Sequence, residues 1–85
     1  MIFLDTCFVP GDGTGGDEKK LANTATREEC MTLVKTREPT ANGATFREWF
    51  NSGWCYAEFN MTDRQWQWVP WQTCKFKGII ISKHS

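Results

Sequence analysis

Histidine is almost absent from the sequence: His84 is the only one, and it follows the last predicted strand. A serine or cysteine nucleophile that works with histidine needs this residue inside the folded body. Glu48 and Glu58 could form a pair of catalytic carboxylates, but exposed glutamates on strands are far commoner than glycosidase pairs. The sequence therefore predicts no catalytic residues and no enzymatic activity.

The sequence also lacks an excess charge and a long apolar segment. Lys and Arg total 10 and Asp and Glu total 10, so the net charge is zero. A nucleic-acid-binding surface needs clustered basic charge, which this sequence does not contain. No apolar run approaches the roughly 18 residues that cross a bilayer, and Ile79–Ile81 is far too short. We expect neither nucleic acid as a partner nor a membrane span.

Zinc-binding cysteine patterns are missing as well, because the sequence has no Cys-x-x-Cys pair and no Cys/His cluster. Segment 10–20, PGDGTGGDEKK, contains three carboxylates that could contact calcium: Asp12, Asp17 and Glu18. Their spacing does not fit an EF-hand loop, and acidic glycine-rich turns are usually only solvated. We predict an irregular loop here, since four glycines disfavour a regular element. We expect no metal site and no cofactor, although calcium binding by this loop stays open.

What the sequence does contain is four cysteines, spread almost evenly over 85 residues. They are Cys7, Cys30, Cys55 and Cys74. A chain this short builds a thin core that disulfides commonly supplement. We predict two structural disulfides in a single module spanning 1–85, with its core at about 3–77 and a last strand or tail at 78–85.

Two disulfides would place the chain in an oxidising compartment, so we expect a secreted, extracellular protein. The sequon Asn60-Met61-Thr62 agrees with this route and makes Asn60 a candidate glycosylation site. The first residues have neither the basic start nor the cleavage site of a signal peptide. The expectation is therefore a mature module, or part of a longer secreted protein.

Hydrophobic periodicity predicts one helix among several strands. The helix begins at the capping-box sequence of residues 26–29, with Thr26 as its N-cap. It ends near Arg37 or Glu38, because Pro39 disfavours helical geometry in the preceding residue. The expected strands are 3–9, 44–46, 54–59, 65–69 and 72–76, with loops at 10–20 and 62–64.

The cysteines fall on apolar faces of these elements. Cys30 lies on the apolar stripe of the predicted helix, and Cys55 lies mid-strand on an apolar face. This order and patterning predict an α+β fold, one helix packed on an antiparallel sheet. Cys30–Cys55 would then join helix to sheet, and Cys7–Cys74 would join the first strand to the last. The sequence alone leaves the two other pairings open.

Four segments, ATREECMTLVK, ANGATF, WCYAEF and WQTCKF, resemble the PAN/apple family. That family has a cysteine near the start beside the last one, and an E-E-C helix tied by a disulfide to a central strand. The resemblance covers about residues 7–76. Apple domains carry a further cysteine pair, which would fall near Val34 and Ala41–Asn42, and this sequence lacks it. The resemblance implies an extracellular adhesion domain that binds proteins or carbohydrates.

All five tryptophans lie in the second half of the sequence, and so small a core cannot bury them completely. Alternation on strand 54–59 directs two rings and a carboxylate away from Cys55, and two further tryptophans share one face of strand 65–69. Rings exposed together mark interaction sites, so we predict that these five residues bind a glycan or an extracellular protein. They are Trp54, Tyr56, Glu58, Trp66 and Trp68.

The alternative is that these rings form a second small core beneath segment 47–53. The chain would then be a structural spacer or repeat of a secreted or cell-surface protein, with no ligand site. Trp71 follows Pro70 and precedes a cysteine strand, so we expect it in the core under either interpretation.

Overall fold

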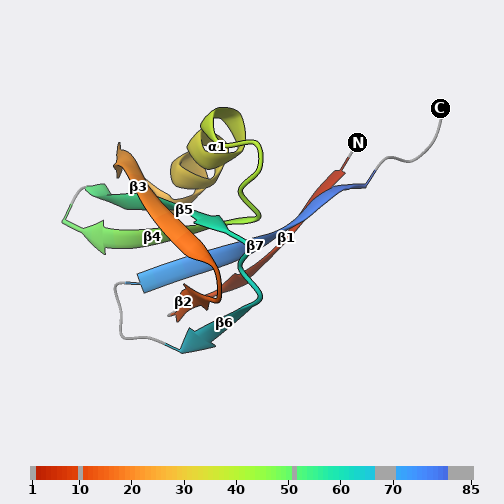
Figure 1. Ribbon diagram of the computed structural model, residues 1–85. Coiled ribbons are helices and arrows are strands. Elements are labelled where there is room, and N and C mark those ends of the chain that lie inside the picture. The colour runs from red at the N-terminus through yellow and green to blue at the C-terminus, as the bar shows by residue number, and fades with distance from the viewer. Residues whose placement is uncertain (1, 10, 51, 67–70, 81–85) are drawn as a thin grey trace.

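The computed structural model describes residues 2–9, 11–50, 52–66 and 71–80. One helix covers one face of a five-stranded antiparallel sheet with strand order β1-β7-β4-β5-β3, and two further strands form a small second sheet, β2-β6 (Figure 1). The elements are β1 Ile2–Phe8, β2 Gly11–Thr14, β3 Asp17–Thr24, α1 Arg27–Arg37, β4 Gly43–Trp49, β5 Ser52–Phe59, β6 Asp63–Trp66 and β7 Trp71–Ile80. Within the described residues, no helix has the length and apolar character that crossing a membrane requires.

The predicted α+β fold is confirmed, and so are both predicted disulfides. Cys30–Cys55 joins α1 to β5, and Cys7–Cys74 joins β1 to β7. β1 and β7 run side by side as a long ribbon (Figure 1), and Cys7 and Cys74 are direct cross-strand partners in it. In the chain-entropy account, each bridge stabilises the fold by about 3–4 kcal/mol.

Helix α1 begins and ends as its sequence predicts. The amide of Glu29 donates to the Thr26 hydroxyl at 3.1 Å, while the Glu29 carboxylate accepts the amide of Ala25 at 2.8 Å. The reciprocal bond therefore reaches one residue further back than in a standard capping box. At the other end, the amide of Glu38 donates to the carbonyl of Val34 at 2.8 Å, and the helix stops before Pro39.

The hydrophobic core lies between α1 and the sheet. Buried residues from the helix meet buried residues from β4 and β5 around the Cys30–Cys55 bridge, and half-buried apolar side chains surround them. The buried members are Cys30, Val34, Ala44, Phe46, Cys55 and Ala57. Removing such side chains from water supplies roughly 1.5–3 kcal/mol for each large one, which makes this the stabilising side of the sheet.

The prediction of an irregular loop at 10–20 is wrong. β2 and the first part of β3 occupy this segment, and Gly15 and Gly16 connect them with φ of 78° and 73°. Positive φ costs glycine little, so the pair permits a tight reversal in which Gly16 closely approaches the carbonyl of Phe59. The glycines here do not prevent strand formation; they allow the strands to pass close to their neighbours.

The prediction of a loop at 62–64 is also wrong, because β6 begins at Asp63. Its partner is β2, with Thr14 opposite Asp63 and Gly11 opposite Trp66. This small sheet lies on the side of the main sheet away from α1 (Figure 1). β4 is longer than the predicted 44–46, and its extension carries Arg47 and Trp49.

Candidate functional site

The face of the five-stranded sheet opposite α1, called the helix-free face, receives every second residue of its strands. On β5, Cys55 faces the helix, so Trp54 and Tyr56 lie on the helix-free face. Cross-strand pairing places Arg47 of β4 opposite Trp54 on one side and opposite Trp71 of β7 on the other. Rings and cations from four strands therefore meet at one end of this face. This aromatic–cationic cluster consists of Lys20, Arg47, Trp49, Trp54, Tyr56 and Trp71.

Arg47 lies at the centre of the aromatic–cationic cluster. Its guanidinium carbon is 4.9 Å from the ring centroid of Trp54, 5.5 Å from that of Trp49 and 5.6 Å from that of Trp71. The ammonium of Lys20, on the neighbouring strand β3, lies 4.9 Å from the Trp54 centroid. Each contact has cation–π geometry, which holds the long basic side chains against the rings.

The hairpin between β4 and β5 ends in two exposed rings, Trp49 and Phe50, called the hairpin tip. They are 56% and 84% exposed, and their centroids lie 5.0 Å apart in an edge-to-face arrangement. Phe50 has φ of 56°, where a bulky side chain is a genuine outlier that costs roughly 1–2 kcal/mol. Asn60 has the same φ, but asparagine commonly adopts it.

The side chain of Arg47 contacts rings but has no hydrogen-bond partner among the described residues. Within the part of the chain that the structure describes, no ion pair or hydrogen bond joins the Arg47 side chain to another residue, in contrast to Lys19, whose Nζ lies 3.2 Å from the Glu38 carboxylate. A guanidinium has five N–H donors in a planar fork. The rings use none of these donors in a hydrogen bond, so the donors remain available to an acceptor from outside the chain.

The other end of the helix-free face is polar and buried. Glu58 is 3% exposed, and the Thr45 hydroxyl donates to its Oε2 at 2.5 Å. The hydroxyls of Thr45 and Thr73 lie 2.9 Å apart, which extends the network onto β7. The small β2-β6 sheet covers this end: a Cβ at Gly13 would lie 3.1 Å from the Glu58 carboxyl. Glu58 is therefore on the predicted face but is closed to a ligand.

Three carboxylates converge at this end, from buried Glu58, half-buried Asp12 of β2 and exposed Glu18 of β3. Oxygens of Asp12, Glu18 and Glu58 all lie within 4.8 Å of one another, whereas Asp17, the third carboxylate of the predicted calcium loop, is exposed opposite Phe59. The pKa of Glu58 is raised to about 8, chiefly by burial. The neighbouring carboxylates of Glu18 and Asp12 also raise it, whereas the hydrogen bond from Thr45 lowers it. Burial also raises the pKa of Asp12. These oxygens are the ones that could hold a cation, and the raised pKa of Glu58 favours a proton there, which would relieve their repulsion.

The remaining predicted residues are more dispersed. Trp66 lies in β6, in the small sheet, and Trp68 lies outside the described residues. Trp71 is half-buried on the helix-free face, 6.1 Å from the Tyr56 ring, rather than in the core as expected. Asn60 is exposed after the end of β5, about 26 Å along that strand from the hairpin tip, so a glycan there would be attached far from that tip.

Sequence reasoning missed Arg47, Trp49 and Lys20. The alternation of Thr45, Arg47 and Trp49 was a usable signal, but it required a strand that continues past Phe46. Lys20 had no such signal, because the strand that carries it lies within a segment expected to be irregular.

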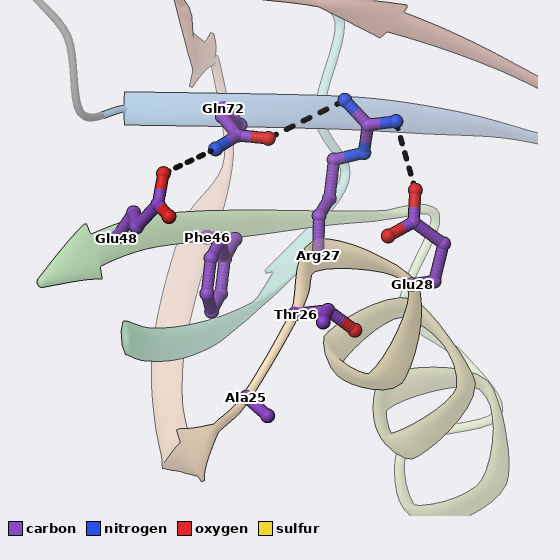
Figure 2. Close-up of a pocket in the computed structure, with 7 residues that line it drawn as sticks. All are labelled: Ala25, Thr26, Arg27, Glu28, Phe46, Glu48 and Gln72. Atoms are coloured by element: carbon purple, nitrogen blue, oxygen red, sulfur yellow. Dashed lines mark hydrogen bonds and ion pairs between the residues drawn. The ribbon is translucent and has the colours of Figure 1, made fainter. Parts of the chain in front are cut away.

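A separate open cavity of about 250 Å³ lies on the helix side, at the start of α1 (Figure 2). Arg27 bridges its polar groups, donating to the side-chain amide oxygen of Gln72 at 3.4 Å and to the Glu28 carboxylate at 2.9 Å. The Gln72 side-chain amide nitrogen in turn donates to the Glu48 carboxylate at 3.5 Å. The one ring in the lining, Phe46, is buried. The full lining is Ala25, Thr26, Arg27, Glu28, Phe46, Glu48 and Gln72. Each of its charged side chains has a polar partner within the lining, and the lining contains none of the predicted ligand-binding residues.

Comparisons with family models, curated proteins and solved structures gave no match. The resemblance to the PAN/apple family therefore remains an expectation. Function has to be argued from the side chains of the site, since a fold by itself does not determine function.

Proposed function

We propose that this chain is an extracellular recognition module, which binds a partner protein through the aromatic–cationic cluster and the hairpin tip. Two disulfides in a domain of this size are compatible with an extracellular location. The proposal deepens the expected binding role but changes the surface: the hairpin tip and Arg47 replace Glu58 and the tryptophans of strand 65–69.

The conformation of Phe50 is the observation that carries the proposal. A turn with only a structural role favours glycine or asparagine where φ is positive. This turn instead has an 84% exposed phenylalanine, which contributes little burial in return for its backbone strain. Strain of this kind is concentrated at functional sites, where a partner compensates for it. Contact with another molecule would bury the ring.

The composition of the surface supports a protein partner. Trp, Tyr and Arg are the residue types enriched among the side chains that dominate protein–protein binding energy. The aromatic–cationic cluster consists of these types apart from Lys20. Moreover, Phe50 and Trp49 stand at the end of a hairpin, where they can insert into a concavity of a partner. A glycan, which stacks on flat rings, is the other candidate ligand, and the spacer interpretation requires no exposed rings.

The test compares the wild-type domain with Phe50→Asn, both multimerised, on arrays of extracellular proteins and of glycans. We expect the wild type to bind one or more proteins, and Phe50→Asn to bind them at least about 30-fold more weakly, the range of a hot-spot residue. Val9→Asn is the matched control, since Val9 is an apolar residue 51% exposed outside this surface.

Loss of binding in Phe50→Asn with retention in Val9→Asn supports the proposal. Binding only to glycans would replace the protein partner with a carbohydrate. If neither array binds the wild type, or if both variants bind as the wild type does, the spacer interpretation is preferred.

A further inference from the structure

The helix-free face has carboxylates at one end and two cations at the other. Its carboxylates, Asp12, Glu18 and Glu58, gather at the end covered by the β2-β6 sheet. Two of its cations, Arg47 and Lys20, lie at the open end among the rings. A third, Lys75, lies near the covered end, where its Nζ donates to the Thr62 carbonyl at 3.3 Å. Among the described residues, no carboxylate forms an ion pair with Arg47 or Lys20, so the open end has two cations without a charged partner there.

From this arrangement we propose that the partner presents an acidic protein segment, whose Asp or Glu carboxylate binds the guanidinium of Arg47 with Lys20 as a second contact. This inference rests on the proposed function and specifies the partner. The expected ligand has a carboxylate, which the two cations bind, beside an apolar side chain.

Arg47 is suited to a carboxylate because its planar fork can donate two parallel hydrogen bonds to one. Contacts with Trp49, Trp54 and Trp71 hold the guanidinium in place before a partner arrives, so little side-chain entropy remains to be lost. Rings that exclude water around the pair also strengthen its attraction. The same side chain in open solvent would gain much less from such a pair.

The adjoining hairpin tip favours a protein segment over an acidic sugar. A carboxylate seated on Arg47 lies beside Trp49, which is in edge contact with Phe50. A peptide can offer an apolar side chain to these rings a residue or two away from its carboxylate. An acidic sugar carries its carboxylate on a ring dense with hydroxyls, which would meet Phe50 without an apolar group to bury it.

A displayed library of random 12-residue peptides tests this directly, with selection on the wild-type domain. Selected peptides are then measured against Arg47→Lys, Lys20→Gln, Phe50→Asn and the control Lys19→Gln. Lys19 neighbours Lys20 on β3 but lies on the opposite face, where it pairs with Glu38. Thermal melts establish that each variant is folded, and the wild type is also measured between 50 and 500 mM NaCl.

We expect the selected peptides to be enriched in Asp and Glu over the starting library, with an apolar residue nearby. Their affinity should fall about tenfold or more in Arg47→Lys, a few-fold in Lys20→Gln and at high salt, and not at all in Lys19→Gln. If Arg47→Lys fails to fold, the Lys20→Gln result and the salt dependence decide.

Peptides without acidic enrichment, which need Phe50 but tolerate changes at Arg47 and Lys20, would overturn the inference and leave the proposed function standing. Binding only to sialylated or uronic-acid glycans, in an Arg47-dependent manner, would assign the carboxylate to a sugar and overturn the protein partner. If no peptide and no glycan binds the wild type, both the inference and the proposed function are wrong.

Discussion

The two faces of the five-stranded sheet come from the same alternating strands, yet they bury opposite kinds of side chain. Toward α1, the buried residues are apolar and a disulfide runs through them. On the helix-free face, the buried residues include Thr45, Thr73 and Glu58, while large rings such as Trp54 are 40% exposed. Alternation assigns residues to a face, but the element that covers the face decides whether they are buried. Stability is therefore expected to depend on the covered face, and recognition on the other.

Removal of the inner disulfide should produce the largest effect and confirm where stability lies. Cys30→Ala together with Cys55→Ala should lower the free energy of unfolding by about 2–5 kcal/mol, close to the whole stability of a small domain. Urea denaturation measures this, and Thr32→Ala, at an exposed position of α1, is the control. An unchanged denaturation midpoint in the double variant would mean that the covered face does not depend on its bridge.

Glu58 provides a second, pH-dependent test, on the helix-free face. Below about pH 4.5, Glu58 is protonated in both the folded and the unfolded chain. Above pH 4.5 the unfolded chain loses this proton, whereas the folded chain keeps it until about pH 8. The folded state binds more protons in this window, so the contribution of Glu58 to stability falls as pH rises and levels off above 8. Each unit of pKa shift corresponds to about 1.4 kcal/mol, so the stability lost over this pH range is a few kcal/mol at most.

Glu58→Gln keeps the shape and an acceptor for Thr45 but cannot ionise. Relative to the wild type, this variant should become progressively more stable between pH 4.5 and 8, with no further gain above 8. Denaturant melts of both proteins across this range provide the measurement. A constant difference at every pH would show that Glu58 titrates normally, and that the cover formed by the β2-β6 sheet is open to water.

The face of the sheet that packs against α1 was predicted well from the sequence, because its signals are local and strong. The capping residues of α1, the proline after it, and the matching faces of Cys30 and Cys55 each pointed to the structure that is present. Alternation also placed Trp54 and Tyr56 on the opposite face.

The helix-free face was harder to predict, because the strands that cover one end of it are distant from it in the sequence. Nothing near Glu58 in sequence indicates that β2 will lie over it, and the glycines of β2 suggested a loop although they serve to admit close packing. The partners of Arg47 come from β4, β5 and β7, so their meeting depends on strand order. That order is a property of the whole chain rather than of any local pattern.

The most direct test of the contrast between the faces is the free energy of unfolding of Phe50→Asn, although its expected change is the smallest of the three. Asparagine tolerates positive φ, so we expect the variant to be about 1 kcal/mol more stable, a rise of roughly 4–8 °C in Tm, while binding by the hairpin tip is lost. Val9→Asn should leave Tm within a few degrees of the wild type. A Tm several degrees lower in Phe50→Asn would contradict this division between the faces. It would mean that the Phe50 ring stabilises the fold itself and is not held exposed for binding.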